Sequence, residues 1–228
     1  GVLPIGAFSG EYAFWSNKGD ESDMTLTREF DFTNVSAPIQ MTYRTWYDLE
    51  EDYDYLYLVA SEDDGKNWQI LTTPSCTTEN PSGNSYGCGY NGKTNGYIQE
   101  DVDLSRFAGK KVLLRFEYVT DAAVNGEGLL LDDVSIPAIN YYTDFENDDD
   151  GWQANGFVRI QNRLPQTFRL TLIYAGSNPR VEYLAVDATT TLRHNVELAE
   201  PTEPVVLVVS GTTRFTRQPA AYTFSAQR

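Results

Sequence analysis

The chain has 228 residues and a formal net charge of −16 at pH 7, from 33 acidic and 17 basic residues. A negative field of this size repels nucleic-acid phosphates and anionic lipids, so neither is expected as a partner, whereas it attracts cations such as calcium. No apolar run approaches the ~20 residues that a membrane-spanning helix needs. The single histidine, His194, excludes zinc sites built on several imidazoles and makes histidine catalysis improbable.

Strand-like runs follow one another along residues 1–140, with no convincing helix between them. They are expected at residues 11–15, 24–32, 39–49, 53–61, 68–72, 97–104, 111–120 and 128–136. Eight antiparallel strands with Gly and Asn turns are typical of a two-sheet jelly roll. Residues 1–140 are therefore predicted to form an all-β jelly-roll sandwich.

The clearest strand lies at residues 53–61. Tyr53, Tyr55, Tyr57 and Val59 fall on one face, and the residues between them fall on the other, which is the two-residue period of a strand. Residues 63–65, Asp-Asp-Gly, then predict a tight turn, because glycine tolerates the positive φ that such turns require.

The two cysteines, Cys76 and Cys88, enclose a loop rich in Pro, Gly, Asn and Ser. Such a loop cannot bury enough apolar surface to order itself, and a disulfide would stabilise it by roughly 3 kcal/mol in a loop-closure model. A Cys76–Cys88 disulfide is predicted, which implies an oxidising compartment. The alternative is a pair of free, buried thiols.

The pattern of strands breaks at residues 137–150, which contain a proline and an acidic run. New strand-like runs follow at residues 156–162, 167–175, 180–187, 189–197, 204–210 and 221–225. Residues 141–228 are predicted to form a smaller immunoglobulin-like β-sandwich, with the domain boundary near Asn140. Trp152, directly after the acidic run, is expected at the interface between the domains.

Several ordered blocks of the sequence resemble one family. They read FWSNKGDESDMTLTREFDF, TWYDLEEDYDYLYLVASEDDGKNW, NPSG, GYNG, VDLSRFAGKKVLLRFEYVTDAAV, LLLDDVSIP and GWQANGFVR. Together they resemble the region after the catalytic domain in secreted metallopeptidases of the immune inhibitor A type. The resemblance covers nearly the first 160 residues and thins beyond Arg159.

In that family the peptidase domain binds zinc through a His-Glu-x-x-His helix, which this chain lacks. The resemblance therefore implies a secreted, non-catalytic accessory region: a MAM-like or carbohydrate-binding-like jelly roll with a terminal sandwich, attached to an upstream peptidase domain. Such a region would position the protease or engage protein substrates. The alternative is a carbohydrate-binding or adhesion module with glycan ligands. The chain begins at Gly1 without a methionine, and we interpret it as part of a longer protein.

Modules related to this family often carry structural calcium. The acidic loop at residues 16–23 could wrap oxygen ligands around such an ion, and jelly-roll topology commonly brings the first and last strands together. We therefore expect Asp20, Asp23 and one of Asp132 or Asp133 to converge on calcium, with Ser16 as a further ligand. The alternative is that these are solvated turn and edge residues.

Two other acidic groups could also be considered as metal sites. Glu50, Glu51, Asp52 and Asp54 form a second possible cluster, but strand alternation would split them between faces, which favours solvated acids. The acidic residues 146–150 resemble the start of a calcium loop but lack its closing glutamate, so they are interpreted as a linker.

Overall fold

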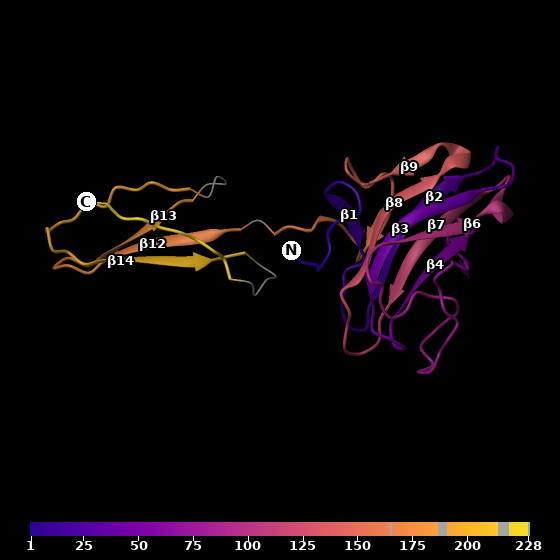
Figure 1. Ribbon diagram of the computed structural model, residues 1–228, viewed down its shortest axis with the longest axis horizontal. Coiled ribbons are helices and arrows are strands. Elements are labelled where there is room, and N and C mark those ends of the chain that lie inside the picture. The colour runs from indigo at the N-terminus through magenta and orange to yellow at the C-terminus, as the bar shows by residue number, and fades with distance from the viewer. Residues whose placement is uncertain (165, 187–190, 214–218, 228) are drawn as a thin grey trace. The chain divides into compact units, whose positions relative to one another are not determined.

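The structure is a computed structural model that describes all residues except 165, 187–190, 214–218 and 228 (Figure 1). Its regular secondary structure is almost entirely β-strand, so the predicted all-β class is confirmed. The helical elements of the described residues are two short 3-10 turns, Ser105–Phe107 and Pro137–Ile139, and no described helix has the length and apolarity to cross a membrane. The chain divides into two compact units, unit 1 (Leu3–Asn162) and unit 2 (Arg163–Arg228).

Unit 1 is a sandwich of two antiparallel sheets. Sheet A has the order β11 (Val158–Gln161), β1 (Tyr12–Trp15), β8 (Gly128–Ile136), β3 (Gln40–Asp48) and β6 (Ile98–Asp103), and β9 (Tyr141–Thr143) pairs with the C-terminal part of β8. Sheet B has the order β10 (Gln153–Asn155), β2 (Asp23–Asp31), β7 (Lys111–Val119), β4 (Tyr55–Ser61) and β5 (Gln69–Ile70).

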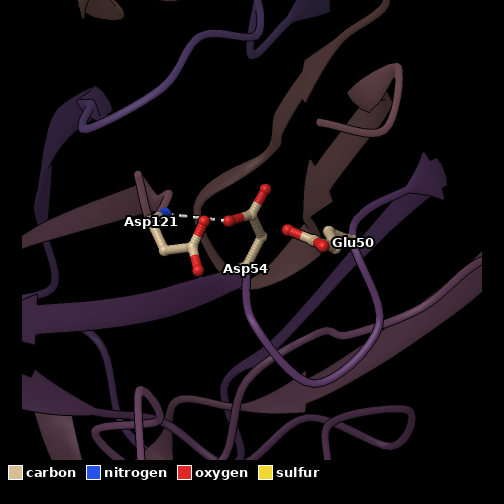
Figure 2. Close-up of side chains that lie close together, drawn as sticks. All are labelled: Glu50, Asp54 and Asp121. Carbon is tan, nitrogen blue, oxygen red and sulfur yellow. Dashed lines mark hydrogen bonds between the residues drawn. The ribbon is translucent and has the colours of Figure 1, made fainter. Parts of the chain in front are cut away.

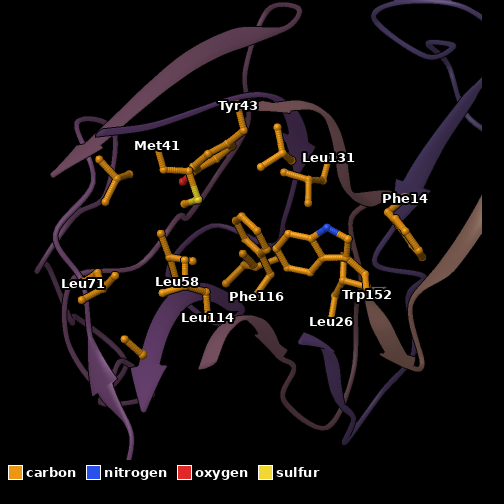
Figure 3. Packing of buried hydrophobic residues seen from close by; sticks show 14 of the residues in the cluster. Phe14, Leu26, Met41, Tyr43, Leu58, Leu71, Leu114, Phe116, Leu131 and Trp152 are labelled. Atoms are coloured by element: carbon orange, nitrogen blue, oxygen red, sulfur yellow. The ribbon is translucent and has the colours of Figure 1, made fainter. Parts of the chain in front are cut away.

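The core lies between the two sheets and is rich in aromatic rings (Figure 3). On β7, every second residue from Val112 to Tyr118 is buried, as the period of a half-covered strand requires. The Phe116 ring meets Tyr43 of β3 edge-on at 5.2 Å between centroids and Trp152 at 6.0 Å. Burial stabilises each such side chain by roughly 1.5–3 kcal/mol, which holds the sheets together.

Strand β4 is buried on both faces. Leu56 and Leu58 point into the core, while Tyr55, Tyr57 and Val59 form a second apolar cluster on the opposite face. The predicted alternation is therefore correct. The predicted turn is also present, because Asp64 and Gly65 both have positive φ, of 58° and 82°.

The loop between β5 and β6 covers the outer face of β4. The disulfide between Cys76 and Cys88 closes this loop, with 5.2 Å between the Cα atoms, so the alternative of free thiols is wrong. Thr77 pairs with Gly89 across the loop. The backbone N–H of Tyr86 donates to the Tyr57 hydroxyl at 2.9 Å. The disulfide loop is thus a packed layer of unit 1.

The predicted boundary near Asn140 falls inside unit 1. After this residue, β9 pairs with β8, β10 pairs with β2 and β11 pairs with β1, so residues 141–162 complete both sheets. Pro137 begins a 3-10 turn rather than a linker. Trp152, predicted at a domain interface, is instead 3% exposed in the core, against Phe30 and Phe116.

Unit 2 contains one three-stranded antiparallel sheet among the described residues. Its order is β13 (Arg180–Leu184), β12 (Phe168–Tyr174) and β14 (Val205–Gly211). The predicted run at 189–197 begins at residues outside the described part, and its described residues, 191–197, form no strand; neither do residues 221–225. The immunoglobulin-like topology of this unit stays a prediction.

The N-terminal segment, residues 3–11, lies on the outer face of sheet A without forming a strand. Leu3 packs there against Trp46 and Leu130. The Asn162 side chain accepts the Leu3 N–H at 2.9 Å and donates to the carbonyl oxygens of Leu3 and Ile5. Side-chain hydrogen bonds therefore take the place of strand pairing in this segment.

Asp132 of β8 is the other anchor of the N-terminal segment. This side chain is fully buried, and its carboxylate accepts the N–H groups of Phe8 at 2.8 Å, Ser9 at 3.1 Å and Asp133 at 2.9 Å. Burial nevertheless raises the pKa of Asp132 to about 7, because the cost of desolvating the charge exceeds the effect of these hydrogen bonds.

A pH dependence of stability follows from Asp132. A folded-state pKa above the unfolded value stabilises the fold at pH values below the unfolded pKa, and that contribution is lost as the pH rises through about 7. The free energy of unfolding of the wild type should therefore decrease relative to that of Asp132→Asn across this window, as measured by urea denaturation at a series of pH values. Parallel curves for the two proteins would contradict the assignment.

Candidate metal centre

Three carboxylates from separate parts of the sequence converge at one end of unit 1 (Figure 2). Glu50 and Asp54 lie in the turn between β3 and β4, and Asp121 follows the end of β7. Their ligand oxygens lie within 4.8 Å of one another. The pairing of β4 with β7, in which Tyr55 lies opposite Val119, places Asp54 beside the chain that carries Asp121.

The turn at residues 50–54 brings Glu50 and Asp54 to the same side. The N–H of Asp54 donates to the Glu50 carbonyl at 3.2 Å, so the two residues are joined as in one turn of a helix. The Asn91 side-chain N–H donates to the carbonyls of both residues, at 3.3 Å and 3.0 Å. The expected strand alternation among the four acidic residues at 50–54 does not occur, because residues 50–54 lie between β3 and β4 and none of them is in a strand.

Asp54 is the fully buried member of the cluster. One carboxylate oxygen accepts the Asp121 N–H at 2.9 Å, and the other accepts the Tyr118 hydroxyl at 3.1 Å. Burial raises the pKa of Asp54, and the negative charges of Asp121 and Asp20 act in the same direction. The hydrogen bonds thus hold the carboxylate in one orientation, while burial and the neighbouring negative charges disfavour its ionised form.

Glu50 has fewer partners. Burial raises the pKa of its carboxyl, and so do the charges of Asp121 and Asp54. Its Oε2 atom is inaccessible to solvent and has no hydrogen-bond partner. Buried polar atoms are nearly always satisfied, and a carboxylate oxygen can be satisfied by a donor or a cation. The all-oxygen ligand set suits a hard cation such as calcium rather than zinc.

The five residues predicted to bind calcium are not brought together. Asp20 alone lies near the cluster, where its charge acts on Asp54. Asp23 is exposed at the start of β2, and Ser16 is buried, with its Oγ accepting the N–H of Leu129 at 2.8 Å. Asp132 anchors the N-terminal segment.

Asp133 also serves the N-terminal segment. Its Oδ1 accepts the Ser9 hydroxyl at 2.6 Å and the Tyr142 hydroxyl at 3.1 Å. Asp132 and Asp133 are thus occupied at a position away from the turn at residues 50–54, and the expectation that one of them joins Asp20 and Asp23 in a single cluster is not met among the described residues.

The acidic residues 146–150 are also structural. One oxygen of Glu146 accepts the N–H groups of Glu11 and Tyr12, at 2.8 Å and 2.6 Å. Asp150 forms an ion pair with Arg28, with 3.3 Å between Oδ2 and Nη1. This run therefore closes the edge of the sandwich rather than linking two domains.

Comparison with known proteins places the chain in a family. A family model described as "Immune inhibitor A-like, MAM domain" matches residues 3–162. Immune inhibitor A of Bacillus thuringiensis subsp. alesti is 36% identical over 156 residues, which are 67% of this chain and 21% of that protein. The pre-pro-metalloprotease PrtV of Vibrio cholerae serotype O1 is 27% identical over 147 residues, 64% of this chain and 15% of that protein.

Bacillopeptidase F of Bacillus subtilis strain 168 is 26% identical over 135 residues, 58% of this chain and 8% of that protein. The chain thus spans about a fifth or less of the length of these relatives. The matched residues, 3–162, coincide with unit 1, which carries the carboxylate cluster. The chain therefore belongs to the immune inhibitor A-like MAM domain family.

Proposed function

We propose that this chain is a non-catalytic accessory region of a secreted zinc metallopeptidase, in which calcium stabilises unit 1 through Glu50, Asp54 and Asp121. Two findings support the accessory role. The chain belongs to the immune inhibitor A-like MAM domain family, and its relatives are named as immune inhibitor A and as a pre-pro-metalloprotease. The Cys76–Cys88 disulfide agrees with secretion, because such bonds persist in oxidising compartments. The region would position the upstream peptidase domain or engage its protein substrates.

The calcium proposal is carried by the unpartnered oxygen of Glu50. Three carboxylates in partly buried surroundings repel one another, and the turn at residues 50–54 and the strand pairing hold them in place despite that repulsion. A divalent cation would offset the repulsion and supply a partner for Glu50. Glu50 and Asp121 would bind it most directly, because both oxygens of Asp54 already accept hydrogen bonds.

Calcium should stabilise the wild-type chain and leave Glu50→Gln nearly unaffected. A cation at a hundred times its Kd stabilises a folded protein by ~2.7 kcal/mol, so the unfolding transition of unit 1 should move to higher temperature when calcium replaces a chelator. In the chelator, Glu50→Gln should melt at or above the wild type, since the substitution removes one repelling charge. Differential scanning calorimetry measures both effects.

Glu51→Gln is the matched control, because Glu51 is an exposed neighbour in the same turn and is not part of the cluster. It should keep the full response to calcium. An equal calcium shift in wild type and Glu50→Gln, or no shift in the wild type, would rule out the proposed site.

The accessory role predicts that the isolated chain has no peptidase activity. Its sequence contains one histidine and no His-Glu-x-x-His segment, so it lacks the two imidazoles from which such a zinc site is built. Purified chain supplied with zinc and calcium should leave casein intact in a fluorescence assay. Hydrolysis that tracks with the purified chain would contradict the non-catalytic assignment.

A specific observation favours carbohydrate binding as a second candidate. Tyr86 of the disulfide loop is 74% exposed, and Tyr53 is 47% exposed. The two residues belong to neighbouring segments, since the Asn84 side chain donates to the Tyr53 carbonyl. Exposed tyrosines can pack against sugar faces. Saturable binding to a polysaccharide that Tyr86→Ala abolishes would favour this function over the first.

A further inference from the structure

A second unpartnered oxygen lies at the same end of unit 1 as the carboxylate cluster. The Oδ1 atom of Asn125 is inaccessible to solvent and has no hydrogen-bond partner. Among the described residues, four buried side-chain polar atoms lack a hydrogen-bond partner, and Asn125 Oδ1 and Glu50 Oε2 are two of them. Asn125 lies four residues after Asp121, in the loop between β7 and β8. Both atoms can accept a hydrogen bond or bind a cation but cannot donate.

Asp20 determines which way the Asn125 amide faces. The side-chain Nδ2 of Asn125 donates to Asp20 Oδ1, and a carboxylate can only accept. The amide oxygen must therefore point away from Asp20. The charge of Asp20 also contributes to the raised pKa of Asp54, a member of the cluster.

The loop that carries Asn125 is held to the β1–β2 loop at Thr120 and at Asp121. The Thr120 hydroxyl donates to the Gly19 carbonyl at 2.6 Å, and the N–H of Glu21 donates to the Asp121 carbonyl at 2.6 Å. Val124 has a φ of 68°, which is a strained conformation for a β-branched residue. Strain of this kind persists only where surrounding contacts hold the backbone in place.

We infer that the Asn125 amide oxygen is a further ligand of the cation held by Glu50 and Asp121, with Asp20 as the positioning residue that orients it. This inference rests on the proposed calcium site. It accounts for the two buried oxygens together, since one ion would satisfy both. The ligands would then come from the β3–β4 turn and the β7–β8 loop, and the β1–β2 loop would support them.

The same arrangement favours calcium over magnesium. Calcium accepts six to eight oxygen ligands and readily includes neutral amide oxygens, whereas magnesium demands near-ideal octahedral geometry and keeps several of its waters. A site that adds a neutral side-chain oxygen to fixed carboxylates suits the larger ion. Asn125 is therefore expected to contribute to selectivity as well as to affinity.

The test is a calorimetric titration of calcium, and separately of magnesium, into the chelator-stripped full-length chain. Asn125→Ala should weaken calcium binding by about tenfold or more and reduce the preference for calcium over magnesium. Asp20→Asn should weaken calcium binding by a similar factor, since changes to residues that orient a metal ligand typically cost about 10–100-fold in affinity. Asn34→Ala and Asp101→Asn, at exposed positions on other parts of unit 1, serve as controls and should bind as the wild type does.

The outcomes separate this inference from the calcium proposal itself. If Glu50→Gln abolishes calcium binding while Asn125→Ala keeps the wild-type affinity and selectivity, the cation site stands and the role of Asn125 is refuted. If the wild type binds no calcium, both fail.

Circular dichroism in the chelator checks that each variant folds. An Asn125→Asp variant provides a second test: it retains an oxygen at this position, so it should bind calcium more tightly than Asn125→Ala. Equal binding by these two variants would overturn the inference.

Discussion

Electrostatic repulsion among Glu50, Asp54 and Asp121 is the constraint on which this account of unit 1 depends. The sandwich fixes these three residues at one end, where burial and mutual repulsion raise the pKa values of Glu50 and Asp54. Neighbouring hydrogen bonds satisfy Asp54 but leave an oxygen of Glu50 without a partner. A cation bound by these carboxylates would offset their repulsion, and the net charge of −16 would favour its approach.

The rest of unit 1 supports this end of the sandwich. The disulfide loop covers the outer face of β4, so the strand that follows the turn at residues 50–54 is packed on both sides. Asn91, three residues after Cys88 in the same loop, donates its side-chain N–H groups to the carbonyls of Glu50 and Asp54. The disulfide and the carboxylate cluster therefore act on the same turn, and a cation there would add a third restraint.

Much of the architecture could be predicted from the sequence, because strand periodicity is a local property. The alternation along β4, the turn at Asp64 and Gly65 and the disulfide were all correct. The boundary near Asn140 was misplaced because a proline and an acidic run resemble a linker, whereas pairing of β9, β10 and β11 with distant strands is a long-range property. The cluster of Glu50, Asp54 and Asp121 was missed for the same reason, since Asp121 meets Glu50 only through the pairing of β4 with β7. The sequence shows the high density of acidic residues around Glu50, but it does not predict the turn that brings Glu50 and Asp54 together.

The most direct test of the account is terbium luminescence, because terbium occupies calcium sites and is excited by nearby aromatic rings. Tyr118 donates its hydroxyl to Asp54 at 3.1 Å, so its ring lies close to the proposed ion. If Glu50 holds the ion, the wild type should show sensitised terbium emission that calcium displaces and that is absent in Glu50→Gln. Emission that is missing from the wild type, or that persists unchanged in Glu50→Gln, would contradict it.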